Sequence, residues 1–192
     1  MKGGTLITFL RAPVAGRVKT RLAATVGDAR ALDIYRRLLM HTLKAWAFLE
    51  CEKEAWYADT VPEEEHAEAY GFTALTQQGE DLGERMAHAI GSAFQRGRSP
   101  VVIIGTDCPG ISEKLLHDSF KALERNDAVI GPARDGGYWL LGMNRMIPDL
   151  FKGKKWSSSR VCADTIADLE RLDLSYALLP ELIDVDNEQD LN

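Results

Sequence analysis

The clearest strand in the chain is Val101-Val102-Ile103-Ile104, which runs directly into Gly105-Thr106-Asp107-Cys108-Pro109. Four consecutive β-branched residues are typical of a strand, and the glycine and proline mark its end. A carboxylate directly after such a strand points out of the sheet edge, where open α/β sheets bind ligands. Asp107 is therefore a candidate ligand for a hard cation such as Mg2+. An Asx-turn or a helix N-cap explains the same aspartate equally well.

On both sides of this strand, short apolar runs alternate with longer amphipathic ones, as in α/β sheet proteins. We expect strands at residues 6–10, 54–58, 72–76, 101–104, 128–130, 138–143, 176–179 and 182–185. We expect helices at residues 29–49 and 83–96, where apolar side chains recur at helical spacing, and further helices at 62–70, 114–123 and 157–172. Because the sequence contains no repeat and no convincing linker, we expect one domain over residues 1–192.

The composition excludes several classes of protein. With 45% hydrophobic and 27% charged residues among 192, the chain can bury a core, and its net charge of -6 argues against a general nucleic-acid binder. The three cysteines form no CxxC pair and no HExxH motif is present, so zinc sites and disulfides are not expected. The apolar run at residues 5–10 is shorter than the roughly 7–15 residues of a secretory signal. We therefore expect a cytoplasmic protein without a membrane span.

A basic loop follows the first predicted strand. Between residues 11 and 22 it carries Arg11, Arg17, Lys19 and Arg21, while Gly16 permits close approach of the backbone to a ligand. Lysine and arginine side chains there can neutralise phosphate oxygens. The motif is not a P-loop, because Val18 stands where that motif has glycine before the lysine. The alternative is a solvated basic loop. Phosphate binding is favoured because the basic segment directly follows a buried strand.

Two acidic segments follow later in the chain. The Asp135-Gly136-Gly137 segment is, from its spacing, a hairpin turn, although it could also let a substrate lie against bare backbone beside Asp135. Asp184 and Asp186 alternate, so in an extended segment at most one of them would face a metal together with Asp107. A solvated acidic C-terminus is the alternative for that second segment.

Two weaker segments open predicted helices. Residues 77–86 form a polar, glycine-marked loop that could contact a nucleotide, although an ordinary acidic helix N-terminus explains it equally well. Residues 156–159, Trp-Ser-Ser-Ser, could border an acceptor site, but a helix N-cap is the favoured interpretation.

In this order, the segments resemble those of a bacterial family of GT-A-type glycosyltransferases, also called rSAM/selenodomain-associated transferases. The resemblance spans nearly the whole chain, from the Arg11-Ala-Pro13 and Lys19-Thr20-Arg21-Leu22 segments to the Asp184-Val-Asp186 segment. It implies a nucleotide-diphospho-sugar transferase fold, a three-layer α/β/α sandwich with a mostly parallel central sheet. The Lys19–Leu22 and C-terminal segments are also similar to those of guanylyltransferases of cofactor synthesis.

The resemblance implies the following roles. Asp107 and Asp186 would be ligands of Mg2+ or Mn2+, and Pro109 stands where many such glycosyltransferases have a second aspartate, so diphosphate oxygens and water would complete the shell. Asp107, Asp135 and Lys19 are the candidate catalytic residues. The candidate nucleotide and phosphate contacts are Arg11, Pro13, Gly16, Lys19, Thr20, Arg21, Gly79, Asp81, Leu82 and Thr106. The candidate acceptor-side residues are Gly136, Gly137, Tyr138, Trp156 and Ser157.

The function implied is Mg2+-dependent transfer of a glycosyl group from a nucleoside diphosphate sugar to an acceptor whose identity the sequence leaves open. Nucleotidyl transfer from a nucleoside triphosphate, with release of pyrophosphate, is the alternative. A nucleotide-binding regulatory module without catalysis is the second alternative, and retention of Asp107 and Asp186 argues against it. We expect no nucleic-acid partner, and a homodimer is one option for the oligomeric state.

Overall fold

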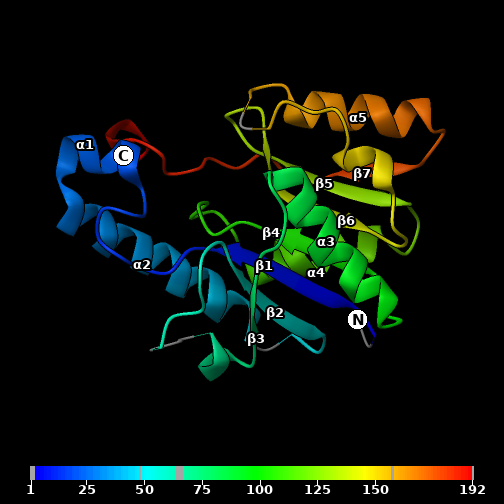
Figure 1. Ribbon diagram of the computed structural model, residues 1–192. Coiled ribbons are helices and arrows are strands. Elements are labelled where there is room, and N and C mark those ends of the chain that lie inside the picture. Colours follow the sequence, from blue (N-terminus) through cyan, green and yellow to red (C-terminus); the bar gives the residue numbers. More distant parts are fainter. Residues whose placement is uncertain (1–2, 48, 64–66, 157, 192) are drawn as a thin grey trace.

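The computed structural model describes residues 3–47, 49–63, 67–156 and 158–191 (Figure 1). These residues contain strands β1 (Thr5–Leu10), β2 (Glu52–Tyr57), β3 (Thr73–Thr76), β4 (Val101–Ile104), β5 (Ala128–Pro132), β6 (Tyr138–Met143) and β7 (Tyr176–Leu178). The helices are α1 (Thr20–Val26), α2 (Asp28–Trp46), α3 (Leu82–Gln95), α4 (Glu113–Ala122) and α5 (Val161–Arg171). Short 3-10 helices are η1 (Glu68–Tyr70), η2 (Pro148–Phe151) and η3 (Glu188–Leu191).

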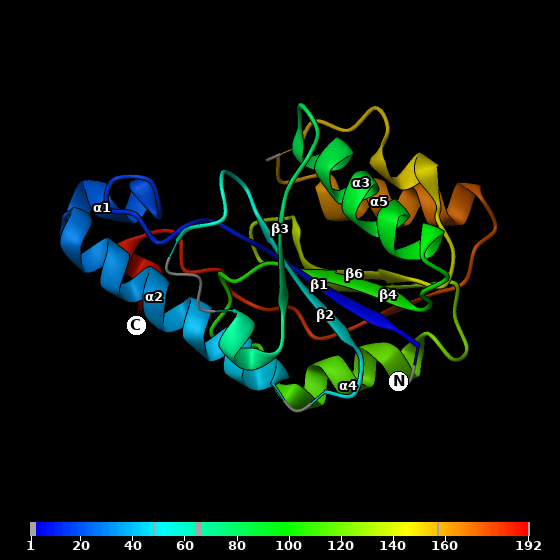
Figure 2. The same ribbon diagram turned by 60° about the horizontal axis from the view of Figure 1, so that its bottom comes forward.

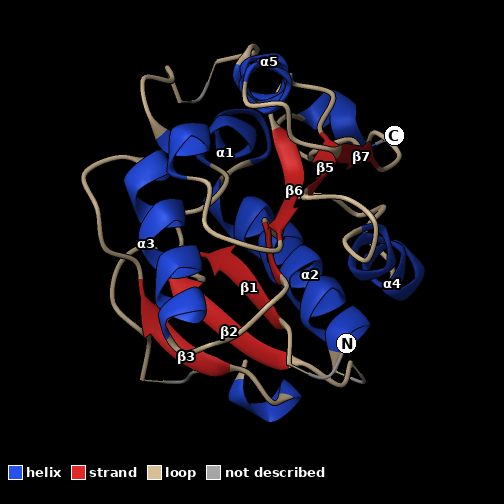
Figure 3. Ribbon diagram, turned by 90° about the vertical axis from the view of Figure 1, so that its right-hand side faces the viewer, coloured by secondary structure: helices blue, strands red, loops and turns tan. Residues whose placement is uncertain are grey.

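The strands form one sheet in the order β3-β2-β1-β4-β6-β5-β7. Figure 3 shows β3, β2 and β1 in one part of this sheet and β6, β5 and β7 in the other. Strands β3, β2, β1 and β4 are mutually parallel, and β7 is parallel to β5. Strand β6 is antiparallel to both of its neighbours, β4 and β5. The predicted α/β class with a mostly parallel sheet is therefore confirmed, and the carboxyl ends of β1, β2, β3 and β4 lie at the same edge.

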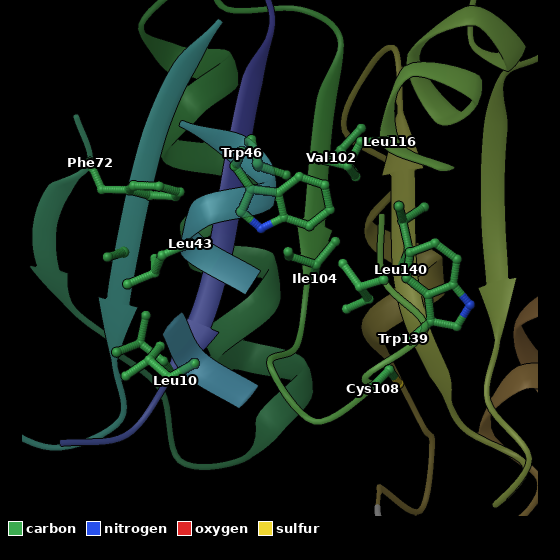
Figure 4. Close-up of a cluster of buried hydrophobic side chains, with 14 of the residues drawn as sticks. Leu10, Leu43, Trp46, Phe72, Val102, Ile104, Cys108, Leu116, Trp139 and Leu140 are labelled. Carbon is green, nitrogen blue, oxygen red and sulfur yellow. The ribbon is translucent and has the colours of Figure 1, made fainter. Parts of the chain in front are cut away.

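Helices cover both faces of the sheet, with α3 and α5 on one side and α2 and α4 on the other (Figure 2). Alternation along β1 explains this arrangement, because Leu6 and Leu10 belong to one buried cluster whereas Ile7 belongs to the other. Figure 4 shows the first cluster, in which Trp46 of α2 packs among side chains of the sheet. Trp46 and Trp56 are 0% and 3% exposed, so both belong to the core.

Most predicted elements are present with small shifts at their ends. The predicted strand at residues 138–143 matches β6, and the predicted strand at 101–104 matches β4. Ser112 caps α4, since its hydroxyl accepts a hydrogen bond from the Leu115 amide. The helix predicted from residue 157 begins only at Val161, and residue 157 lies outside the described part of the chain. The predicted helix at 62–70 is wrong for the part described, where only η1 is helical.

The C-terminal segment differs most from expectation. The predicted strand at residues 182–185 is wrong, because only an isolated bridge between Ala133 and Leu182 forms there. After this bridge the chain leaves the sheet and runs toward α1, as Figures 1 and 2 both show. No helix in the described residues has the length and apolar content required to cross a membrane.

Candidate active site

A cavity of about 690 Å³ opens where β1, β2, β3 and β4 end. Leu10 and Arg11 come from the end of β1, Thr106 and Asp107 follow β4, and Gln77 follows β3. Further walls come from the start of α1, from the first turn of α3 and from Asp186 near the C-terminus. The cavity thus lies at the sheet edge that the sequence predicted for ligand binding.

Lys19 is the buried cation of this cavity. Its ammonium lies 2.6 Å from Asp107 Oδ1 and 3.7 Å from Asp186 Oδ1, and its side chain is only 4% exposed. Despite the short distance, Nζ has no well-aligned hydrogen bond with any part of the chain that the structure describes. An ammonium has three N–H donors, so Lys19 retains donor capacity for an oxygen ligand.

The backbone at Lys19 is itself unusual, with φ 48° and ψ 43° in the left-handed region. This conformation is uncommon for a residue other than glycine, and such residues cluster at functional sites. It places Lys19 at the N-cap of α1, and the adjacent Val18 is 2% exposed in the core. The turn thereby directs the ammonium toward Asp107 while Val18 anchors the loop.

The C-terminal segment brings two aspartates to the same edge, each with a different partner. Asp186 contacts Arg21, with Nη1 of the arginine 3.3 Å from Oδ2, in addition to Lys19. Asp184 instead accepts a hydrogen bond of 2.8 Å from the Cys108 thiol. Burial, together with the charges of Asp135, Asp107 and Asp186, raises the pKa of Asp184 to about 6. The segment is fixed here because the Val185 amide donates to the Asp107 carbonyl at 3.0 Å.

Tyr35 connects α2 to the end of β1 through hydrogen bonds with the Arg11 backbone. The Arg11 amide donates to the Tyr35 hydroxyl at 2.8 Å, and that hydroxyl donates to the Arg11 carbonyl at 2.9 Å. Burial raises the pKa of Tyr35 to about 12, although the hydrogen bond with Arg11 acts in the opposite direction. The phenol therefore stays protonated and holds the loop backbone that lines the cavity.

The loop before α3 forms the opposite wall. Asp81 caps α3 by accepting a 2.9 Å hydrogen bond from the Glu84 amide, and the Arg85 side chain donates to the Gly79 carbonyl at 3.0 Å. Gly79 has φ 139°, and a β-carbon there would lie 2.7 Å from the Arg85 amide nitrogen. Glycine is therefore needed at this turn, which places Asp81, Leu82 and Arg85 on the cavity.

The predicted acceptor-side segments pack against one another beside this wall. Gly136 has φ 89°, and a β-carbon there would lie 2.1 Å from the Ser159 carbonyl oxygen. Gly83 in the first turn of α3 similarly leaves room for the Trp156 indole, which would lie 2.3 Å from an added β-carbon. Asp135 accepts a 2.7 Å hydrogen bond from the Gly137 amide, as expected for the turn between β5 and β6.

Two carboxylates at the cavity are candidate ligands for Mg2+. Among the described residues, no group of three or more His, Cys, Asp and Glu side chains is placed to hold a metal ion. Asp107 and Asp186 supply two carboxylates whose side chains are 46% and 40% exposed. Mg2+ is commonly held by one or two carboxylates together with water and phosphate oxygens. The donor set therefore fits Mg2+ bound jointly with a diphosphate.

Residues 40–158 match the family model DUF2064, described as uncharacterized proteins conserved in bacteria. The chain belongs to this family. A crystal structure of a candidate nucleotide-diphospho-sugar transferase from Desulfovibrio desulfuricans G20 has 34% sequence identity and a TM-score of 0.92, covering 100% of this chain and 85% of that one. The chain is thus a transferase of the nucleotide-diphospho-sugar transferase superfamily. Among curated protein sequences, none matches.

More distant structures share the fold. 4-Diphosphocytidyl-2C-methyl-D-erythritol synthase from Anaerococcus prevotii DSM 20548 has 14% identity and a TM-score of 0.64, covering 99% of this chain and 93% of that one. The inositol-1-phosphate CTP transferase from T. maritima has 11% identity and a TM-score of 0.63, covering 100% of this chain and 94% of that one. These likenesses show the fold alone.

The structure brings most of the predicted binding residues together. Those that line the cavity are Arg11, Lys19, Thr20, Arg21, Asp81, Leu82, Thr106, Asp107 and Asp186. The predicted residues outside its lining are Pro13, Gly16, Gly79, Asp135, Gly136, Gly137, Tyr138 and Trp156. Among these, Tyr138 directs its hydroxyl to the Met86 sulfur at 3.6 Å, toward the core. Ser157 lies outside the described residues.

Several lining residues were missed as site residues. They are Phe9, Leu10, Arg17, Val18, Tyr35, Ala58, Gln77, Glu80, Arg85 and Gly105. Arg17 stands within the basic loop and could have been found from its charge. Tyr35 could not, because its spacing marks it only as an apolar position of α2.

Proposed function

We propose that this protein is a Mg2+-dependent transferase that takes a nucleoside diphosphate sugar as donor and passes its glycosyl group to an acceptor. The observation that carries the proposal is the buried Lys19 ammonium, which contacts both Asp107 and Asp186 and keeps unused donor capacity beside the cavity. A buried ammonium that is ion-paired but keeps unused N–H donors gains from a ligand that accepts hydrogen bonds from them. Phosphate oxygens are the ligands that suit it.

The surroundings of Lys19 support phosphate binding. Besides Lys19, the cavity is lined by four arginines, namely Arg11, Arg17, Arg21 and Arg85. Fixed positive charges in a partly enclosed site stabilise the charge that develops on a leaving diphosphate. The first turn of α3 adds the positive end of a helix dipole on the same cavity.

Asp107 and Asp186 are the proposed ligands of Mg2+. The ion would supply Lewis-acid stabilisation of the leaving diphosphate when bound. Lys19 and Arg21, which contact these carboxylates, would bind and orient the diphosphate beside the ion. Asp135 lies outside the cavity lining, in the turn between β5 and β6, and stays a candidate for orienting the acceptor.

Nucleotidyl transfer is the second candidate. It is favoured by the number of cations on the cavity, because five basic side chains are more than a diphosphate alone requires. A triphosphate whose α-phosphate is attacked would release pyrophosphate from the same place. Positioning and electrostatic stabilisation would dominate this chemistry as well.

Thermal unfolding with a panel of nucleoside triphosphates and nucleotide sugars, with and without Mg2+, tests the proposal. A ligand at one hundred times its Kd adds about 2.7 kcal/mol to the free energy of unfolding. A Mg2+-dependent shift with one nucleotide sugar supports glycosyl transfer, and a shift with a triphosphate alone supports nucleotidyl transfer. No shift with any of them contradicts both.

The Asp107→Ala variant then tests catalysis with the donor identified in this way. We expect turnover to fall by roughly 10²–10³-fold, as when one electrostatic stabiliser is deleted. Asp118→Ala is the control, because Asp118 pairs with Lys114 on the surface of α4, outside the cavity. Equal turnover in the two variants would exclude the role given to Asp107.

A further inference from the structure

We infer that Lys19 is the resident counter-ion of Asp107 and Asp186 in the nucleotide-free protein, and that it competes with a divalent cation for this pair until a phosphate group draws the ammonium away. The inference rests on the proposed function, because it takes Asp107 and Asp186 as the metal ligands. It goes further because Lys19 exchanges its carboxylate partners for a phosphate group, which couples metal binding to nucleotide binding.

The contacts of Lys19 show why the two cations compete. Nζ lies 2.6 Å from Asp107 Oδ1 and 3.7 Å from Asp186 Oδ1, so a single ammonium contacts both carboxylates. A metal ion bonded to the same pair would lie within a few ångströms of this charge. Two like charges at such a distance repel strongly, all the more where one of them is almost removed from water.

The same contacts show how Lys19 can be released. The ammonium has ion pairs but no well-aligned hydrogen bond within the described chain, so moving it breaks few directional bonds. Asp186 keeps Arg21 as a partner when Lys19 leaves, at 3.3 Å from Oδ2. Phosphate oxygens in the cavity offer the acceptors that Lys19 lacks.

The consequence is positive coupling between metal and nucleotide. In the free protein Lys19 neutralises the carboxylates and lowers their affinity for a cation. A bound phosphate takes over the ammonium, which frees the carboxylates and raises the affinity for the metal. By linkage the metal raises the affinity for the nucleotide by the same factor. Couplings of this kind commonly amount to roughly 5- to 150-fold.

Binding of Mn2+ alone, followed by electron paramagnetic resonance on the nucleotide-free protein, tests the inference. We expect Lys19→Met to bind Mn2+ at least about tenfold more tightly than the wild type, because a competing charge is removed. Lys154→Met is the matched control. Lys154 is also a buried lysine, 3% exposed and paired with Asp168, but it lies outside the cavity. We expect its Mn2+ affinity to equal that of the wild type.

The outcomes separate this inference from the proposed function. Equal or weaker Mn2+ binding by Lys19→Met, with binding lost in Asp107→Asn, would overturn the competition but keep the metal site. Binding that is undetectable in every variant, or that persists in Asp107→Asn, would overturn the metal site itself and the inference with it. Lys19→Gln serves as a second variant if the methionine variant does not fold.

Acetylation of the wild-type protein gives a measurement that needs no variant. An amine-reactive reagent should label Lys19 slowly in the free protein, because its side chain is 4% exposed. Added Mn2+ should accelerate that labelling severalfold by displacing the ammonium, while Lys154 in the same digest stays slow. Unchanged labelling of Lys19 at saturating Mn2+ would contradict the displacement.

Discussion

At the scale of single residues, the cavity depends on side chains that hold the backbone as well as on those that face the ligand. Tyr35 shows this, since its hydroxyl makes hydrogen bonds with both the amide and the carbonyl of Arg11. Arg11 directly follows β1, so these two bonds fix the point at which the basic loop leaves the sheet. Tyr35 is therefore a positioning residue for the loop that carries Lys19.

Tyr35→Phe should expose this role. The substitution leaves the Arg11 amide without its partner, and an unsatisfied polar group of this kind costs about 1–3 kcal/mol of unfolding free energy. We also expect weaker nucleotide binding, because the loop is no longer held in one conformation. Urea unfolding and nucleotide titration measure the two effects.

Tyr176→Phe is the control for this substitution. It removes a hydrogen bond to Glu170 on an exposed surface away from the cavity. Surface substitutions of this type usually change stability by less than about 0.5 kcal/mol. If Tyr35→Phe matched the control in both stability and nucleotide affinity, Tyr35 would have no positioning role.

At the scale of elements, α3 joins one wall of the cavity to the proposed acceptor side. Its first turn lines the cavity through Leu82 and Arg85, and the adjacent Gly83 packs against the Trp156 indole. The contact is close because Gly83 has no side chain. A single residue of α3 thus sets the distance between the helix and the loop before α5.

Alanine substitutions at two glycines of α3 should have opposite effects. Gly83→Ala would place a β-carbon 2.3 Å from the Trp156 indole, and such overpacking typically costs about 1–3 kcal/mol. Gly91→Ala meets nothing within 4 Å, so the gain in helix propensity should stabilise the protein by about 0.4–1 kcal/mol. Thermal unfolding of the two variants provides the comparison. Stabilisation by both would show that Trp156 moves aside freely.

At the scale of the whole molecule, the C-terminal segment connects the loop after β4 to helices α1 and α2. Val185 is 4% exposed in a small cluster with Leu22, Ala31 and Leu38 of α1 and α2. Its amide is hydrogen-bonded to the Asp107 carbonyl, and the next residue is Asp186. Packing of this small cluster therefore determines whether Asp186 lies beside Lys19.

Val185→Ala should loosen this cluster without unfolding the sheet. Loss of two buried methyl groups costs about 1–2 kcal/mol. We expect faster amide hydrogen exchange in α1 and weaker nucleotide binding, with unchanged exchange in β1 and β4. Ile183→Ala is the control, because Ile183 is 43% exposed. Equal acceleration in the sheet and in α1 would show that the cluster does not open separately.

The sequence by itself determined the α/β class, most strands and the positive charge of the loop after β1. The strand at residues 101–104 was clear because all four of its residues are β-branched, and the start of the strand at 138–143 was clear because Gly136 and Gly137 precede it. Lys19 and Arg21 were found because charge next to a buried strand is a local property of the sequence. These features depend on neighbours along the chain.

Tertiary structure alone decided how the distant residues meet. Helix α1 has only seven residues and is stabilised by the burial of Leu22 rather than by its own propensity. The final strand was predicted wrongly because residues 183–186 gain more from contacts with the Asp107 loop and α1 than from pairing in the sheet. The contact of Lys19 with both Asp107 and Asp186 arises from the same packing. Sequence spacing does not predict this contact, because the free energy that stabilises it comes from packing between segments that only the folded chain brings together.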